Sequence, residues 1–236
     1  MFARFSPFLI LLLAANVFAA GTVTIESEGD GNRATMVIEY LDNNTLRLNL
    51  PSQAGSYMLI RDGKVYTVAM MNGAPMVMDM GAMSKMASAF GAADNAEEND
   101  ATGPLDYEVL DMKDTGRTEV VAGFKGKVYE VTAKSKSGTK SEEVVFSSDP
   151  AVRAYSDAWM NAGKTMEQVL QQGKSSSNDL NDYMAKHKLG LLRYGKEFRV
   201  VSIDGKKPSA DRFQLPSAPM GMPDFGSMFG GAMQQK

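Results

Sequence analysis

The stretch SYMLIRDGKVYTVAMM, residues 56–71, decides the fold. Two apolar runs flank Asp62-Gly63, and a two-residue Asp-Gly connection is a strong hairpin signal because both turn positions tolerate positive φ. We therefore predict two antiparallel strands, over residues 56–61 and 64–70.

The segments before this hairpin repeat with a period of two residues. Apolar side chains take every second position over residues 34–40 and 46–50, which is typical of half-buried strands. Pro51 ends the second run, since proline lacks the N–H that a strand ladder needs. Residues 21–28 supply an earlier strand that pairs with the first of these runs. This part of the chain is therefore predicted to be an antiparallel meander.

Further strands follow downstream at intervals of roughly ten residues. The alternating runs cover residues 107–112, 118–122, 127–134, 142–147, 189–194 and 197–203, and residues 213–215 add an edge strand. This spacing favours hairpins over crossover units. The predicted fold class is α+β, with one antiparallel β-sheet and short helices.

Helical periodicity appears in three regions. Methionines recur at helical spacing over residues 81–90, which predicts a short amphipathic helix. Ser147-Ser148-Asp149-Pro150 forms a helix start, with a capping hydroxyl or carboxylate before a proline near the first helical position. We expect helices over residues 151–162, 165–172 and 180–188, with Gly163 separating the first two.

Targeting and tail segments flank a single predicted domain. Residues 1–20 combine Arg4, a short apolar run and small residues before the expected cleavage after Ala19 or Ala20, which is typical of a signal peptide. We expect one domain over residues 21–216, a flexible acidic loop within it over residues 92–106, and a flexible Met/Gly/Pro-rich tail over residues 217–236. The loop lacks the spaced pattern of a calcium site, so a solvated loop is the preferred interpretation.

Charge and cysteine content narrow the range of partners. The chain has 25 Lys and Arg against 28 Asp and Glu and no basic stripe, so we expect no nucleic-acid partner. It has no cysteine, so neither a lipid-modified cysteine nor a disulfide holds it. The apolar run near the start is too short to span a membrane. We predict a periplasmic or secreted protein that is soluble after cleavage of its signal peptide and does not span the membrane.

Catalytic motifs are missing from the sequence. The single histidine, His187, lies between two lysines on a polar helix. No serine stands in a Gly-x-Ser-x-Gly context, and Gly163-Lys164-Thr165 lacks the first glycine of a phosphate-binding loop. We therefore predict a protein that is not an enzyme and carries no cofactor.

Methionine is the compositional outlier, with 18 residues gathered mainly in one segment and in the tail. Methionine is a flexible apolar filler that suits an adaptable binding surface, which is the preferred interpretation. Thioethers are also ligands for Cu(I), and the alternative metal site would use Met78, Met80, Met220 and Met222. Plain core packing is the third interpretation.

Two stretches carry a family resemblance: MLIRDGKVY at residues 58–66 and TGRTEVVAGFKGKVYEV at residues 115–131. They resemble a family of uncharacterised exported bacterial proteins whose domain is similar to the LolA/LolB lipoprotein-carrier group. The resemblance implies a strongly curved antiparallel half-barrel with an apolar concave face. Helices near Met80, Trp159 and Met166 would lie across that face as a lid. This chain lacks the cysteine near Lys125 that family members often carry, and it lacks a transferable basic docking pattern, so lipoprotein transport itself is not carried over.

These observations predict a non-enzymatic periplasmic binding protein. An apolar cavity under a Met-rich lid would take a hydrophobic small molecule, a lipid acyl chain or a hydrophobic peptide segment. The predicted lid and cavity residues are Met70, Met76, Met78, Met80, Met83, Met86, Phe90 and Trp159. The alternative is a periplasmic protein that binds Cu(I) or buffers methionine oxidation.

Overall fold

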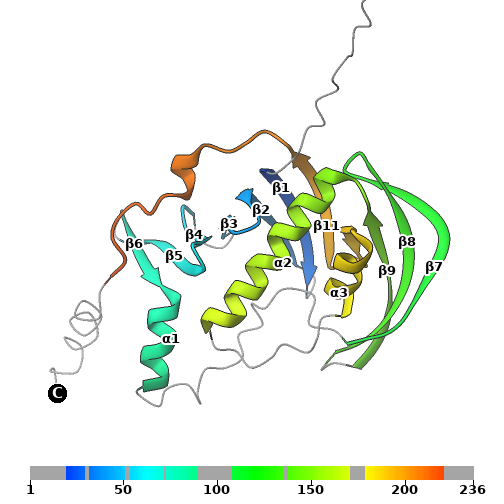
Figure 1. The fold of residues 1–236 in the computed structure, drawn as a ribbon, viewed down its shortest axis with the longest axis horizontal. Helices are drawn as coiled ribbons and strands as arrows, with labels where there is room; N and C mark the ends of the chain where they lie inside the picture. The colour runs from blue at the N-terminus through cyan, green and yellow to red at the C-terminus, as the bar shows by residue number, and fades with distance from the viewer. Residues whose placement is uncertain are drawn as a thin grey trace, which may run out of the picture.

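One antiparallel sheet organises the molecule. The computed structural model describes residues 20–29, 32–50, 54–71, 73–89, 108–135, 138–170 and 179–220. In these residues eleven strands form an open sheet in the order β6-β5-β4-β3-β2-β1-β11-β10-β9-β8-β7, and every neighbouring pair is antiparallel. Figure 1 shows β6 and β7 at opposite ends of the molecule. The α+β class and the antiparallel sheet are confirmed.

The strands fall into two meanders that meet where β1 pairs with β11. The first meander contains β1 (Gly21–Gly29), β2 (Asn32–Asp42), β3 (Thr45–Asn49), β4 (Tyr57–Arg61), β5 (Lys64–Met71) and β6 (Ala74–Asp79). The second contains β7 (Glu108–Val121), β8 (Phe124–Ser135), β9 (Gly138–Ser147), β10 (Gly190–Tyr194) and β11 (Phe198–Asp204). The predicted hairpin is β4–β5, and Asp62 and Gly63 take the positive φ values, 53° and 69°, that its turn needs.

Two of the predicted strand assignments are wrong. The separate strands expected over residues 107–112 and 118–122 are one strand, β7, whose ladder is irregular between Asp114 and Thr118. The hydroxyl of Thr115 donates to the carbonyl of Val128 there, so the strand stays attached to β8 through the irregularity. The edge strand expected over residues 213–215 is absent, because Phe213 ends a 3₁₀ turn, η2 (Ala210–Phe213), and packs into the molecule.

The helices are α1 (Met80–Ala89), α2 (Pro150–Leu170) and α3 (Asp179–His187). The predicted start of α2 is confirmed, and of the two kinds of cap expected the carboxylate is used: Asp149 Oδ1 accepts from the N–H of Ala151 at 2.9 Å. The break expected at Gly163 is wrong, and α2 continues through it as one helix. Gly163 is exposed, with open space where a side chain would stand, so it costs only helix propensity.

Side chains are buried on both faces of the sheet. The larger cluster joins one face to α2 and α3, and it includes Ile38, Phe146 and Tyr155. The smaller cluster lies on the opposite face of β4–β6 and holds Tyr57, Leu59, Tyr66, Val68 and Val77 together with Phe213. The alternation within β5 separates them, since Val65 belongs to the first cluster and Tyr66 to the second.

Helix α2 lies across the sheet, as Figure 1 shows, and touches it closely at β10. The N–H of Leu191 donates to the hydroxyl of Ser156 at 3.0 Å. A Cβ placed on Gly190 would lie 2.5 Å from the carbonyl oxygen of Val152, so only glycine lets the helix backbone approach this near. Within the described part of the chain, no helix combines the length and the apolar character needed to cross a membrane.

Candidate functional site

A surface rich in methionine lies where β6 runs directly into α1. We call Met76, Met78, Met80, Met83 and Met86 the methionine surface, and all five side chains are half-buried. Asp79 starts the helix, with its Oδ1 accepting from the N–H groups of Gly81 and Ala82 at 3.0 and 3.1 Å. The exposed positions of α1 recur every third residue, at 82, 85 and 88, so Met83 and Met86 lie on its less exposed side.

Strand register places Met76 and Met78 on the face of the sheet that the helices cover. They pair with Ala69 and Thr67 of β5, which lie on the Val65 side of that strand. Met70 pairs with Pro75 and therefore points to the opposite face, where it is 45% exposed. The structure thus brings Met76 and Met78 to the face of the larger cluster but separates Met70 from them.

Helix α1 is attached to the end of α2. The hydroxyl of Ser84 donates to the carbonyl of Leu170 at 3.2 Å. Gly81 faces Val169, and a Cβ at position 81 would lie 3.2 Å from a Val169 methyl group. Met80 packs against the larger cluster. The first two turns of α1 therefore lie beside the last turn of α2, next to the end of β6.

The remaining predicted residues lie elsewhere. Trp159 is half-buried on α2 and packs against the larger cluster. Met220, from the alternative metal set, lies beside β6, because its N–H donates to the carbonyl of Val77 at 2.9 Å. Phe90 and Met222 fall outside the described residues, as do the predicted acidic loop over residues 92–106 and residues 1–19 of the predicted signal peptide.

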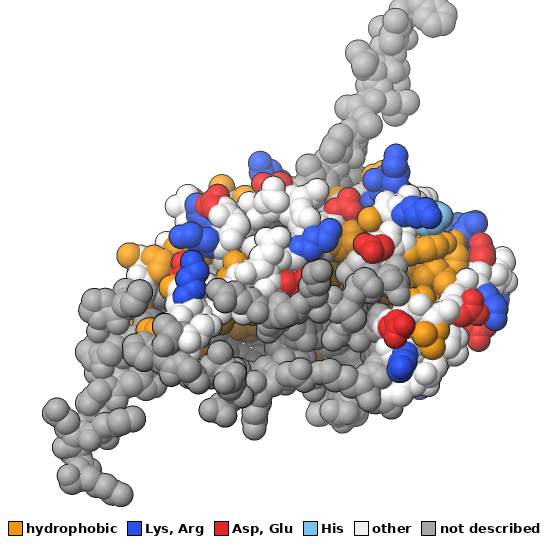
Figure 2. Space-filling model, turned by 60° about the horizontal axis from the view of Figure 1, so that its bottom comes forward, with side chains coloured by type: hydrophobic (Ala, Val, Ile, Leu, Met, Phe, Trp, Pro, Cys, Tyr) orange, Lys and Arg blue, Asp and Glu red, His pale blue; other side chains and the backbone are white. Residues whose placement is uncertain are grey.

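A second apolar area lies at the other end of the molecule. Figure 2 shows hydrophobic side chains gathered beside the single histidine. The ring of His187 lies 4.3 Å from that of Tyr183, and Tyr183 lies 6.0 Å from both Tyr129 and Phe146. Both ends of the helix-covered face thus present apolar or aromatic side chains.

A shallow polar depression of about 210 Å³ lies between α2, α3 and the β2–β3 turn. Its lining includes Asp157, Lys164, Asn181 and Asp182. Burial raises the pKa of the Asp157 carboxyl, and Arg153 partly offsets that shift. Over the described ranges, no group of three or more His, Cys, Asp or Glu side chains is placed to hold a metal ion. The depression supplies polar contacts but shows no nucleophile–base pair.

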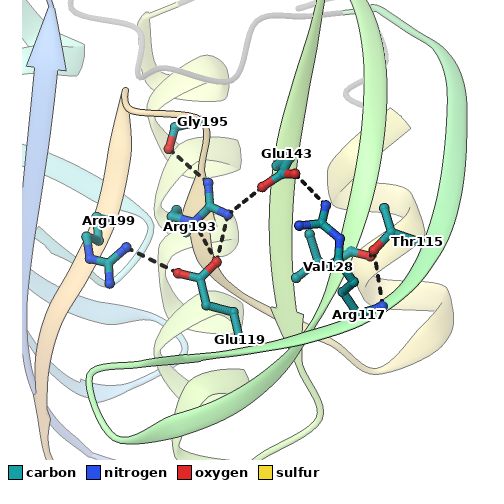
Figure 3. A network of polar contacts seen from close by, with 8 residues as sticks. All are labelled: Thr115, Arg117, Glu119, Val128, Glu143, Arg193, Gly195 and Arg199. Atoms are coloured by element: carbon teal, nitrogen blue, oxygen red, sulfur yellow. Dashed lines mark hydrogen bonds and ion pairs between the residues drawn. The ribbon is translucent and has the colours of Figure 1, made fainter.

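An ion-pair network that the sequence did not reveal joins β7 to the middle of the sheet (Figure 3). The guanidinium of Arg193, with its side chain 14% exposed, donates to Glu119 at 2.7 Å and to Glu143 at 3.1 Å. Arg199 reaches Glu119 at 3.3 Å, and Arg117 pairs with Glu143. Hydrogen bonds from Arg117 and Arg193 lower the pKa of the Glu143 carboxyl. Every carboxylate in the network has an arginine partner. The network therefore links β7 and β9 to β10 and β11.

Comparison with protein-family models, with curated proteins and with solved structures finds no match to this chain. Its function is therefore argued from geometry.

Proposed function

We propose that this protein is a non-enzymatic periplasmic binding protein that holds an acyl chain or a hydrophobic peptide segment beneath α1. The observation that carries the proposal is the partial burial of the methionine side chains. Met184 alone among the described methionines is buried, whereas the methionine surface is only half-buried on the helix-covered face. A surface of flexible thioether side chains adapts its shape to an apolar guest.

The packing of the inner strands of the sheet sharpens this contrast. Val23, Ile38, Leu59 and Val144 are fully buried, as expected for a close-packed interior. The β6–α1 end of the same sheet is apolar but keeps partial exposure. The ligand would complete the packing there, and the sheet would curve around it as a half-barrel.

The binding energy needed is modest. Each methylene group transferred from water contributes about 0.8 kcal/mol, so about ten groups contribute roughly 8 kcal/mol, which corresponds to micromolar affinity. Displacing α1 would break the Ser84–Leu170 hydrogen bond and the contact of Gly81 with Val169, and it would draw Met80 away from the larger cluster. A neutral hydrogen bond contributes about 1 kcal/mol and burial of a methionine side chain at most about 1.5–3 kcal/mol, so α1 suits a cover that a ligand of about ten methylene groups can displace.

Binding of a fluorescent fatty acid to the full chain tests the proposal. Met83→Asp combined with Met86→Asp places two carboxylates on the covered side of α1, and we expect binding to fall at least about tenfold, since an unpaired buried charge costs well over 1.4 kcal/mol. Met70→Asp is the matched control, because Met70 is exposed on the opposite face and its substitution leaves binding unchanged. Equal loss in both variants, or in neither, would contradict the proposal.

A second candidate function is Cu(I) binding by thioethers. It is favoured by the Met220–Val77 hydrogen bond, which brings Met220 to the strand that carries Met78 and leads into Met80. Anaerobic titration with Cu(I) tests it. Stoichiometric binding that is lost on Met78→Leu with Met80→Leu would establish this function, and unchanged binding would reject this site.

A further inference from the structure

The C-terminal segment after β11 binds the sheet face that the helices leave open. We call residues 205–220 the C-terminal arm. In Figure 1 the arm runs from the end of β11 past η2 to β6. Its contacts are with β2–β6, which lie more than a hundred residues earlier in the chain.

An aromatic side chain anchors the arm. Phe213 is 2% exposed and belongs to the cluster of Tyr57, Leu59, Tyr66, Val68 and Val77. Leu215, two residues later, packs against the same cluster. The face therefore contains a pocket for an aromatic residue and a place for an aliphatic one.

Polar contacts fix the arm around that pocket. Glu39, which is 7% exposed, receives two hydrogen bonds from the guanidinium of Arg212, at 2.5 and 2.7 Å. The guanidinium groups of Arg47 and Arg61 donate to the carbonyls of Arg212 and Phe213, at 3.0 and 3.1 Å. A bidentate charge pair and donors to consecutive carbonyls form a recognition geometry for the 3₁₀ turn η2, which presents Arg212 and Phe213.

One backbone hydrogen bond adds a further contact at the sheet edge. Met220 donates its N–H to the carbonyl of Val77 at 2.9 Å, and Val77 lies in the edge strand β6. Addition of an extended segment to a sheet edge is a recurring form of peptide recognition. The arm thus uses a pocket, a charge pair and an edge together.

The connector between β11 and the anchors is mostly exposed. Lys206, Lys207, Ser209, Ala210 and Asp211 are all exposed. The anchors are Arg212, Phe213 and Leu215, and within the connector, residues 205–211, only Gly205 and Pro208 are half-buried. Such a connector suits an arm that can leave its own sheet and bind another.

We propose that the open face of β2–β6 is a docking surface for an Arg-Phe-x-Leu segment, and that it accepts the C-terminal arm of a second copy of this chain. The arm of a second copy presents the same residues, and Glu39 complements its Arg212 by charge. Within one chain the arm binds its own pocket at the high effective concentration that a short connector gives. Exchange of arms with a second copy therefore becomes favourable when the arm's own pocket is weakened. This inference is independent of the ligand beneath α1.

Two full-length variants test arm exchange by complementation. Glu39→Gln with Arg61→Ala weakens the pocket and keeps the arm, whereas Arg212→Ala with Phe213→Ala removes the anchors and keeps the pocket. The two chains, given tags of different mass, are mixed and examined by native mass spectrometry. We expect a species with the summed mass in the mixture and monomers in each separate sample.

The result that would overturn the proposal is a mixture that stays monomeric while circular dichroism shows both variants folded. Dimers in either separate sample would also overturn it, since they would use another contact. If the pocket variant fails to fold, a labelled synthetic peptide of residues 205–220 is titrated into the Arg212→Ala, Phe213→Ala variant. Binding that is lost when the peptide carries Phe213→Ala supports the proposal, and absence of binding refutes it.

Discussion

Replacement of Gly190 by alanine is predicted to push α2 off the sheet. The added Cβ would lie 2.5 Å from the carbonyl oxygen of Val152 and 2.8 Å from the hydroxyl of Ser156. The first of these atoms belongs to the helix backbone, so the clash cannot be relieved by a side-chain rotation. The helix must move, and the Leu191–Ser156 hydrogen bond at 3.0 Å lengthens as it does so.

The magnitude follows from two contributions. Overpacking of a well-packed contact costs about 1–3 kcal/mol, and weakening a buried hydrogen bond adds about 1 kcal/mol. We therefore expect Gly190→Ala to lower the free energy of unfolding by roughly 2–4 kcal/mol. Because 1 kcal/mol shifts the melting temperature of a domain of this size by about 2–4 °C, the midpoint falls by roughly 4–16 °C.

Urea unfolding followed by tryptophan fluorescence measures this effect. Trp159 is the single tryptophan and lies on α2, so the signal reports on the helix that moves. Gly163→Ala is the matched control on the same helix, where a Cβ meets open space, and it is expected to raise stability by up to about 1 kcal/mol. If Gly190→Ala unfolds within about 0.5 kcal/mol of the wild type, the close contact between α2 and β10 is refuted.

Three further predictions concern buried polar groups. Tyr40→Phe is expected to raise the free energy of unfolding, measured in thermal melts, by about 1 kcal/mol. The reason is that the Tyr40 hydroxyl is buried without a hydrogen-bond partner in the described part of the protein. A loss of stability would mean that the hydroxyl is paired. Burial raises the pKa of Tyr40 and Tyr129 to about 12. The unfolded chain therefore loses these protons at lower pH than the folded protein does, and the free energy of unfolding declines as pH rises from about 10 towards 12. A spectrophotometric titration in which every tyrosine ionises near pH 10 would contradict this prediction. Arg193→Ala is expected to lower the free energy of unfolding in urea by about 1–3 kcal/mol, since it leaves Glu119 with only the more exposed Arg199. Arg199→Ala is the control and should lower it by under about 1 kcal/mol. Equal effects of the two substitutions would show that the network does not centre on Arg193.

Local turn and capping chemistry made much of the fold predictable. The Asp62-Gly63 turn and the cap at Asp149 each depend on residues adjacent in sequence, so their signals are complete in a short window. Strand alternation identified the first meander for the same reason. The break expected in α2 was wrong because Gly163 faces solvent, where its weak propensity is outweighed by the packing of the helix on either side.

Contacts between distant residues were not predictable in this way. The Glu39–Arg212 pair spans 173 residues, and the Glu119–Arg193 pair spans 74, so no local pattern marks either one. The separation of Met70 from Met76 does have a signal. A turn at Gly73 pairs Met70 with Pro75, and strand alternation then assigns opposite faces to the two methionines.

Native mass spectrometry of the protein purified from the cells that produce it, followed by denaturing extraction, tests the central claim most directly. The account predicts an added mass that resolves into apolar acyl or peptide species, that is retained by Met70→Asp and that is lost from Met83→Asp combined with Met86→Asp. An empty protein, or an added mass equal to one or two copper ions, would contradict it.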